Sequence, residues 1–106
     1  MEYVTLNNGY KIPQLGFGTI QQFDKQIEDN VAFALNNGYE LIDTANRYGN
    51  EVEVGKGLKL SGLKREDYFL ETKLGPTLYE NDQAIDDTLK RLGVDYVDVM
   101  ILHHPV

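Results

Sequence analysis

Three apolar runs in this chain each end in a polar residue, and these polar residues are thirty positions apart. Asp43 closes the first run, Lys73 the second and His103 the third. A polar group at the end of a buried strand is costly unless it is paired or serves a site. A spacing of about thirty residues is typical of a strand, a crossover helix and the next parallel strand. The pattern predicts an α/β fold whose reactive side chains share one edge of a sheet.

The residues between these runs favour alternating strands and helices. Asn8-Gly9 separates two short β-prone runs, which predicts a hairpin over residues 3–13. Asn and Asp before helical patterns, and glycines after them, give the expected helix limits. We expect strands over residues 14–19, 39–43, 68–73 and 96–102, and helices that begin near Asp24, Asn50 and Asp82, the first two capped by Asp24 and Asn50.

Apolar residues at helical spacing mark the face of each helix that should pack on the sheet. Ile27 begins such a face in the first helix. The third helix carries Ile85, Leu89 and Leu92 at positions i, i+4 and i+7. We therefore expect all four residues to lie in the core.

The placement of polar residues favours a barrel over an open sheet. Gly16-Phe17-Gly18 is not a dinucleotide fingerprint, because Gln21 stands where the third glycine should be. An open doubly wound sheet binds ligands only at its switch point. Here three consecutive strands contribute at their carboxyl ends, as in barrel enzymes. We predict a partial (β/α)8 TIM barrel, with an N-terminal hairpin, about four parallel strands and three helices, forming one domain over residues 1–106.

Composition excludes several classes of function. A net charge of −7 disfavours nucleic acid and anionic membranes as partners, because both attract basic surfaces. No apolar run approaches the ~20 residues of a membrane span, and no secretion signal is evident, so we expect a cytoplasmic protein. The chain has no cysteine and only two histidines, which are adjacent. We therefore expect no disulfide and no metal site.

With these segments in place, the chain resembles the amino-terminal half of an aldo-keto reductase. The family's patterns run through essentially the whole chain, and their order and spacing make the resemblance specific. They are Asn8-Gly9 with Ile12–Thr19 (IPQLGFGT), Gly38–Glu51 with Val54-Gly55, Thr72-Lys73-Leu74, and Leu89–Pro105 (LKRLGVDYVDVMILHHP).

The resemblance implies an NADP-dependent barrel enzyme that reduces aldehydes and ketones to alcohols. It implies that NADP(H) is the cofactor and that a small carbonyl compound is the substrate. It also implies two sets of site residues. The catalytic set is Asp43, Tyr48, Lys73 and His103, and the set near the nicotinamide end of the cofactor is Gly18, Thr19 and Asp43.

The chemistry of these residue types agrees with carbonyl reduction. The reaction needs a hydride on carbon and a proton on oxygen, and a phenol with its ordinary pKa near ~10 is a poor donor at neutral pH. A nearby ammonium lowers the pKa of a phenol, and a carboxylate keeps that ammonium charged and placed. Lys73 and Asp43 supply these groups beside Tyr48. His103 can orient the carbonyl oxygen by a hydrogen bond.

Each of the four residues also has a purely structural interpretation. Asp43 could be a cap or rim acid, and Tyr48 is one of seven tyrosines, which more often pack than react. Lys73 could extend its ammonium from a strand end to solvent, and His103 could be hydrogen-bonded in a turn. Only the set, at matching strand ends, favours catalysis.

The chain departs from the family in its aromatic residues and its length. Relatives often carry tryptophans at the substrate mouth where this chain has Gly75 and His104. A closed barrel of this kind takes ~250 residues. The family holds the adenosine and its 2′-phosphate mostly with carboxyl-terminal strands. We therefore expect 106 residues to act as a truncated reductase of weak or no activity.

The alternative is a half-barrel module without catalysis that associates with itself. The strand near Leu15–Phe17 and the strand at Val97–Leu102 would both be edges of an unclosed sheet. The second edge is strongly β-prone and carries one charge. We expect these edges to form a homodimer or to promote aggregation.

Overall fold

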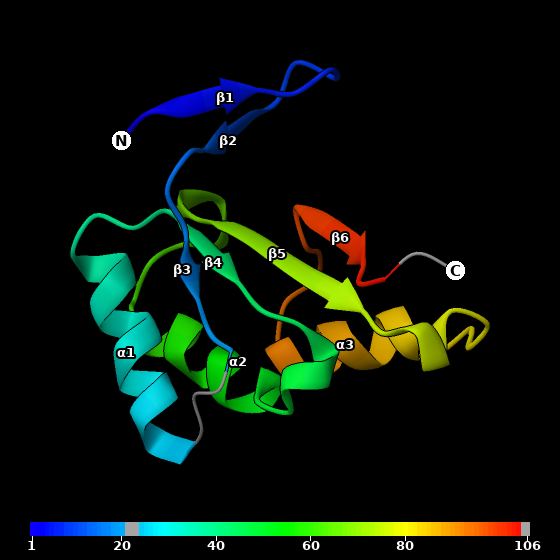
Figure 1. Ribbon diagram of the computed structural model, residues 1–106. Helices are drawn as coiled ribbons and strands as arrows, with labels where there is room; N and C mark the ends of the chain where they lie inside the picture. Colours follow the sequence, from blue (N-terminus) through cyan, green and yellow to red (C-terminus); the bar gives the residue numbers. More distant parts are fainter. Residues whose placement is uncertain (21–23, 105–106) are drawn as a thin grey trace.

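The computed structural model describes residues 1–20 and 24–104 of the 106-residue chain, with backbone only for residues 24 and 25. It contains a small antiparallel sheet, a parallel sheet and three α-helices (Figure 1). The strands are β1 (Tyr3–Thr5), β2 (Lys11–Pro13), β3 (Phe17–Gly18), β4 (Leu41–Asp43), β5 (Phe69–Leu74) and β6 (Val99–Leu102). The helices are α1 (Asp24–Asn36), α2 (Glu51–Leu60) and α3 (Ala84–Leu92), and three 3-10 turns are η1 (Asn46–Tyr48), η2 (Arg65–Asp67) and η3 (Pro76–Leu78).

The parallel sheet has the strand order β3-β4-β5-β6, so each strand pairs with the next one along the chain. All three pairings are parallel, and Ile42 of β4 stands beside Leu70 of β5. A helix in each connection is the βαβ arrangement that a thirty-residue period predicts. The hairpin is also confirmed: β1 pairs antiparallel with β2, and Gly9 takes φ 87 in the turn between them.

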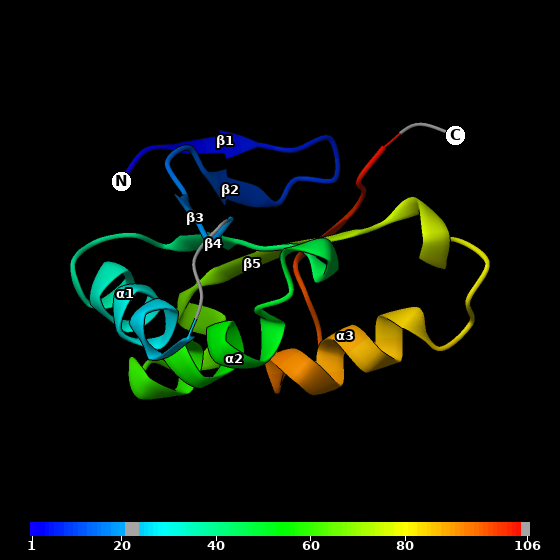
Figure 2. The ribbon, with the colours of Figure 1, turned by 60° about the horizontal axis from the view of Figure 1, so that its bottom comes forward.

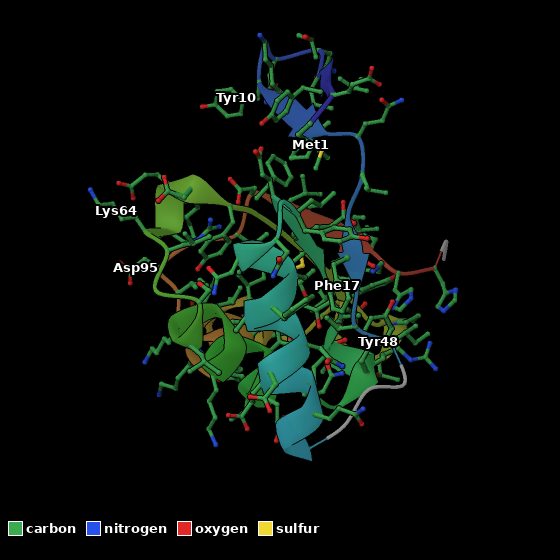
Figure 3. All side chains as sticks on the ribbon, turned by 90° about the vertical axis from the view of Figure 1, so that its left-hand side faces the viewer. Met1, Tyr10, Phe17, Tyr48, Lys64 and Asp95 are labelled. Carbon is green, nitrogen blue, oxygen red and sulfur yellow. The ribbon has the colours of Figure 1, made fainter. Side chains whose placement is uncertain are left out.

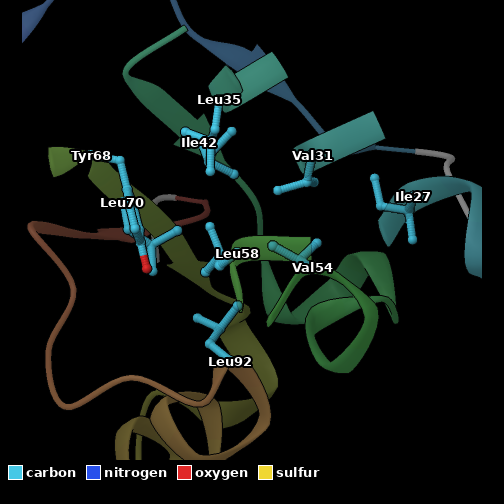
Figure 4. Close-up of a cluster of buried hydrophobic side chains, with 9 residues drawn as sticks. All are labelled: Ile27, Val31, Leu35, Ile42, Val54, Leu58, Tyr68, Leu70 and Leu92. Atoms are coloured by element: carbon cyan, nitrogen blue, oxygen red, sulfur yellow. The ribbon is translucent and has the colours of Figure 1, made fainter. Parts of the chain in front are cut away.

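The helices lie on one side of the parallel sheet and the hairpin lies on the other (Figure 2). The core fills the space between the sheet and the helices (Figure 4). Ile27 and Val31 of α1, Ile42 of β4 and Leu92 of α3 are all fully buried there. None of the helices in the described ranges is long and apolar enough to cross a membrane.

Helix α2 is held close to both of its neighbours through two glycines. A Cβ on Gly55 would stand 2.5 Å from the carbonyl oxygen of Leu92 in α3. A Cβ on Gly57 would stand 2.7 Å from the carbonyl oxygen of Glu28 and 2.8 Å from the Cβ of Val31 in α1. Real Cβ atoms do not approach backbone oxygens so closely, so these contacts require glycine.

The prediction for the inner face of α3 was right for Leu92, which is fully buried, and wrong for Ile85, while Leu89 is half-buried. Ile85 is 49% exposed, and the fully buried face consists of Ala84, Thr88 and Leu92. Thr88 accepts a hydrogen bond from Arg91 (3.1 Å), whose guanidinium also pairs with Glu51 at 2.8 Å. The buried Glu51 carboxylate needs this cation, so α3 turns its polar stripe toward α2 and leaves Ile85 outside.

Two further local predictions need correction. Asn50 stands at the N-cap position of α2, but its side chain makes no capping hydrogen bond. It donates instead to the carbonyl oxygen of Thr19, 2.8 Å away. The expected strand over residues 14–19 is shorter, since β3 covers Phe17–Gly18. The capping side chain predicted at Asp24 lies outside the described residues.

Candidate active site

The parallel sheet brings Asp43 and Lys73 to one end and one face. Side chains alternate along β5, where Leu70, Thr72 and Leu74 are buried toward the helices. Lys73 therefore faces the opposite side of the sheet. Asp43 ends the neighbouring strand β4, two residues earlier in the register. Their side chains meet because strands of a parallel sheet end along the same edge.

The Lys73 ammonium connects three oxygen atoms. Its Nζ lies 2.5 Å from Asp43 Oδ1, 3.2 Å from the Thr44 carbonyl oxygen and 3.2 Å from Tyr48 Oη. The lysine side chain is 14% exposed. Burial lowers the pKa of Lys73, but the hydrogen bonds and charges of Asp43 and Tyr48 outweigh it and raise the pKa overall. Lys73 is therefore a permanent cation at neutral pH, in hydrogen-bond contact with a phenol.

Tyr48 contacts this ammonium from a loop whose conformation is set by local hydrogen bonds and by Gly49. Its amide donates to the Ala45 carbonyl oxygen (3.2 Å) in turn η1, and Gly49 ends the turn with φ 72. The side chain of Asn46 accepts a hydrogen bond from the Gly75 amide (3.2 Å), just after β5. The loop that carries Tyr48 is thus tied to the end of the strand that carries Lys73.

His103 follows β6 and lies beside Tyr48. Its amide donates to the Leu74 carbonyl oxygen (2.9 Å), and its ring centroid lies 6.0 Å from that of Tyr48, edge to face. Burial lowers the pKa of His103, and the charges of His104 and Lys73 lower it further. A lowered pKa leaves the imidazole neutral at pH 7, with one N–H for a hydrogen bond. Its Nδ1 is buried without a partner among the described residues.

Sequence reasoning missed a fifth group, Glu71. It stands opposite Asp43 in the register and on the same face of β5 as Lys73. Burial raises the pKa of Glu71 to about 7, and a hydrogen bond and repulsion from Asp43 add to the effect, while Lys73 opposes it. The signal was its position two residues before Lys73, since residues i and i+2 of a strand share a face.

The residues predicted at the nicotinamide end of the cofactor also meet at this edge. Gly18 pairs with Asp43 in the register and is exposed, and a Cβ on Gly18 would have no neighbour within 4 Å, so there is unfilled space beside its Cα. The Thr19 hydroxyl is fully buried and donates to the Asp43 carbonyl oxygen (3.1 Å). Gly18 and Asp43 are thus accessible to a ligand at this edge of the sheet. Thr19 is not accessible, and its hydroxyl stabilises the backbone at Asp43. Their part in cofactor binding stays a prediction.

The described residues contain no group of three or more His, Cys, Asp or Glu side chains that could hold a metal ion. The four predicted catalytic residues, in contrast, come together from β4, η1, β5 and the end of β6. Sequence reasoning located Asp43, Lys73 and His103 because each stands at or next to the carboxyl end of a strand, and Tyr48 because it lies in the polar loop after Asp43. Figure 3 places Tyr48 on the opposite side of the molecule from Lys64 and Asp95.

Comparison with known proteins identifies the family of the chain. A sequence profile described as the Aldo/keto reductase family matches residues 14–106. The chain is 46% identical over 111 residues to the D/L-glyceraldehyde reductase of Hypocrea jecorina, covering 97% of this chain and 34% of that protein. It is 47% identical over 103 residues to the glycerol 2-dehydrogenase (NADP(+)) of Saccharomyces cerevisiae, covering 96% and 33%. The chain thus spans about a third of the length of these relatives.

Solved structures show the same relationship. The aldo/keto reductase of Brucella melitensis superposes with a TM-score of 0.91 at 45% identity, over 96% of this chain and 40% of that one. The aldose reductase of Schistosoma japonicum superposes with a TM-score of 0.93 at 37% identity, over 100% and 38%. The predicted partial (β/α)8 barrel is confirmed. The chain belongs to the aldo/keto reductase family.

Proposed function

We propose that the cluster of Asp43, Tyr48, Lys73 and His103 reduces aldehydes or ketones to alcohols. The observation that carries this proposal is the position of Lys73 Nζ, which contacts Asp43 Oδ1 at 2.5 Å and Tyr48 Oη at 3.2 Å. A partly buried acid–base pair that ends on a hydroxyl is an arrangement suited to proton transfer.

The residues divide the work by position. Tyr48 gives its proton to the carbonyl oxygen of the substrate. His103, whose ring centroid lies 6.0 Å from that of Tyr48, donates a hydrogen bond to the same oxygen. Lys73 Nζ lies 3.2 Å from Tyr48 Oη, where its positive charge would stabilise the negative charge that develops on this oxygen during proton transfer. Asp43 holds Lys73 in place. When bound beside Gly18 and Asp43, NADPH would supply the hydride for the carbonyl carbon.

The proposed cofactor is NADP(H), with its nicotinamide end near Gly18, Thr19 and Asp43. The unfilled space beside the Cα of Gly18, next to the partly exposed Asp43, supports this assignment. Two similar proteins add support: the yeast relative is named for NADP(+), and an aldo-keto reductase of Bombyx mori, 32% identical, was solved in complex with NADP.

Absorbance of NADPH with a panel of aldehydes tests the proposed function. We expect weak or no turnover from residues 1–106 alone. We expect turnover from a hybrid, in which residues 1–106 are joined to the remaining carboxyl-terminal segment of the Brucella melitensis reductase. The hybrid that carries Tyr48→Phe is the matched control. A folded hybrid that binds NADPH but reduces no aldehyde would refute the proposal, and clear turnover by the chain alone would refute the expected weakness.

A second candidate function is self-association without catalysis. The last strand, β6, ends the order of the parallel sheet, and Leu102 at its end is 62% exposed. Ile85 on α3 and Leu15 before β3 are 49% and 57% exposed. Unpaired strand edges beside exposed apolar side chains favour pairing with a second copy.

Size-exclusion chromatography with light scattering at micromolar concentration tests this second candidate. We expect a dimer or larger species for the chain alone, and a shift toward monomer for Leu102→Asp. Lys64→Asp, at the other end of the sheet, is the control. A monodisperse monomer with cooperative unfolding would exclude self-association.

We propose the cytoplasm as the compartment and a small carbonyl compound as the partner, rather than nucleic acid or a membrane. The absence of cysteine supports a compartment in which disulfides are not used. The net charge of −7 supports the absence of a polyanionic partner.

A further inference from the structure

Arg47 lies directly beside the proposed catalytic cluster. It precedes Tyr48 in turn η1, and its side chain packs over Gly75 at the end of β5. A Cβ built on Gly75 would stand 2.9 Å from both Cγ and Cδ of Arg47. Leu74, the residue before Gly75, accepts the hydrogen bond of the His103 amide. The arginine stem therefore lies at the carboxyl end of β5, over Gly75, which is two residues along the chain from Lys73.

The backbone of Gly75 does not require glycine. Its φ of −74 and ψ of 154 are open to any residue. What the missing Cβ provides is room for the Cγ and Cδ atoms of Arg47. Because Gly75 has no Cβ, the Cγ and Cδ atoms of Arg47 can pack directly against the backbone that follows β5.

The guanidinium of Arg47 has no hydrogen bond or ion pair with residues 1–20 or 24–104, and the residue is exposed. Arg65 and Arg91, in contrast, each pair with a carboxylate at 2.7 and 2.8 Å. Lys73, the neighbouring cation, is already neutralised by Asp43. The positive charge of Arg47 acts on the catalytic cluster, since its repulsion contributes to the lowered pKa of His103.

We propose that Arg47 binds an anionic group, a carboxylate or a phosphate, carried by the carbonyl substrate at a distance from the reacting carbon. This inference rests on the proposed function, because it names the substrate class of the same cluster. A guanidinium presents two parallel N–H donors that match either anion, and Arg47 has no competing partner in the described part of the chain. The substrate would thus be held at one end by Arg47 and at its carbonyl by Tyr48 and His103.

Binding to the chain itself tests this inference without a need for turnover. The probes are two matched pairs: 4-carboxybenzaldehyde with 4-nitrobenzaldehyde, and glyceraldehyde 3-phosphate with glyceraldehyde. The readout is the NMR shift of the Arg47 Nε–Hε signal during titration, assigned from its loss in Arg47→Met. We expect saturable shifts with the anionic member of at least one pair, and none with the neutral members. The pair that responds distinguishes carboxylate from phosphate.

Variants separate charge from packing. We expect Arg47→Met to weaken binding of the responding anion by about tenfold or more, and to change the neutral aldehyde by about twofold or less. Gly75→Ala should weaken the anion in the same direction because it displaces Arg47, and should add nothing in the Arg47→Met background. Lys64→Met removes an equal charge on the far side of the molecule, and should leave all four affinities unchanged.

Three results would overturn the inference. Equal shifts with anionic and neutral probes would show that Arg47 only packs. Loss of affinity in Lys64→Met equal to that in Arg47→Met would show a general charge effect. A saturable Arg47 shift with NADP+ and none with the anionic aldehydes would assign the residue to the cofactor. If Arg47 binds anions while the hybrid reduces nothing, the proposed reaction fails and the anion site stands.

Discussion

Two ion pairs flank strand β5, one at each end, and they differ in what surrounds them. Lys73 pairs with Asp43 at the carboxyl end, and Arg65 pairs with Asp98 at the amino end. The exposed fractions of their side chains are similar, 14% and 28% for the first pair and 17% and 24% for the second. Burial alone does not tell the two pairs apart.

The Arg65 pair is surrounded by backbone and aromatic rings. Arg65 donates to the carbonyl oxygens of Tyr68 (2.9 Å) and Tyr96 (3.1 Å), and its guanidinium stands 4.0 Å from the Tyr96 ring centroid. Asp98 accepts a hydrogen bond from the Leu70 amide at 2.8 Å. The three hydrogen bonds to backbone groups tie the segments around Tyr68, Leu70 and Tyr96 together, so this pair is a structural clamp.

The Lys73 pair ends instead on the hydroxyl of Tyr48, a group that can lose its proton. A cavity of about 320 Å³ lies at the Arg65 pair, where Arg65, Tyr68 and Tyr96 are among the residues that line it. None of the four predicted catalytic residues lines this cavity, so it does not change the contrast between the two pairs. The third partner of a partly buried ion pair, rather than the pair itself, therefore separates a reactive cluster from a structural clamp.

The largest effect should come from removing the titratable partner. We expect Tyr48→Phe to lower kcat and kcat/KM of the hybrid together by about 10²–10⁴-fold, because proton donation acts in the transition state. Tyr68→Phe removes a hydroxyl beside the other ion pair and should leave both constants within about twofold. NADPH oxidation with one aldehyde measures both variants, and fluorescence titration of NADPH should give equal cofactor affinity.

If Tyr48→Phe changed only KM, Tyr48 would be a binding residue and not the acid. Equal losses in Tyr48→Phe and Tyr68→Phe would remove the distinction between the two ends of β5.

The next effect separates stability from rate. Arg65→Met should lower the free energy of unfolding by about 1–3 kcal/mol, because Asp98 and two backbone carbonyls lose a charged donor. Lys73→Met should slow the hybrid by about tenfold or more, because Tyr48 Oη loses its ammonium contact. Urea unfolding and steady-state rates of both variants make the comparison. A larger stability loss in Lys73→Met than in Arg65→Met, with rates equally affected, would contradict it.

The smallest effect concerns pH and Glu71. Burial and Asp43 raise the pKa of Glu71 to about 7 from 4.5, so between these pH values the folded chain keeps a proton that the unfolded chain has lost. The contribution of Glu71 to stability is therefore greatest below pH 4.5 and is lost as pH rises to 7. At pH 8 we expect Glu71→Gln to unfold with a free energy about 1–3 kcal/mol higher than the parent chain.

At pH 4 the Glu71→Gln variant and the parent chain should differ little, because Glu71 is then protonated in both states. Glu66→Gln, on the exposed turn η2, should show no such pH-dependent difference. If the free energies of unfolding of the Glu71→Gln variant and the parent chain differed by the same amount from pH 4 to 8, the pKa of Glu71 would not be raised by folding.

The sequence predicted the order of elements well because local signals and long-range register agree. Asn8-Gly9 and the helix-ending Gly93, with φ 71, act through backbone conformations that few other residues adopt. The thirty-residue spacing places Asp43 and Lys73 at neighbouring strand ends whatever the packing details are. These features can be predicted without knowing which side chains contact one another in the fold.

The errors come from side chains whose role depends on a distant partner. Ile85 has the spacing of a core residue, but Arg91 and Thr88 turn the helix toward the buried Glu51 of α2. Asn50 has the identity of a cap, but the carbonyl of Thr19 takes its amide. Periodicity describes one helix at a time, so it does not include such cross-element hydrogen bonds.

The glycine contacts of α2 also affect how the chain opens and closes. Gly55 and Gly57 fix α2 against α3 and α1, and the turn that carries Tyr48 leads directly into α2. Local opening of α2 would separate three helices at once, so its amide hydrogens should exchange with solvent more slowly than those of the hairpin. Tyr48 is thus attached to backbone that we expect to exchange slowly, so its position should persist through local opening of the hairpin.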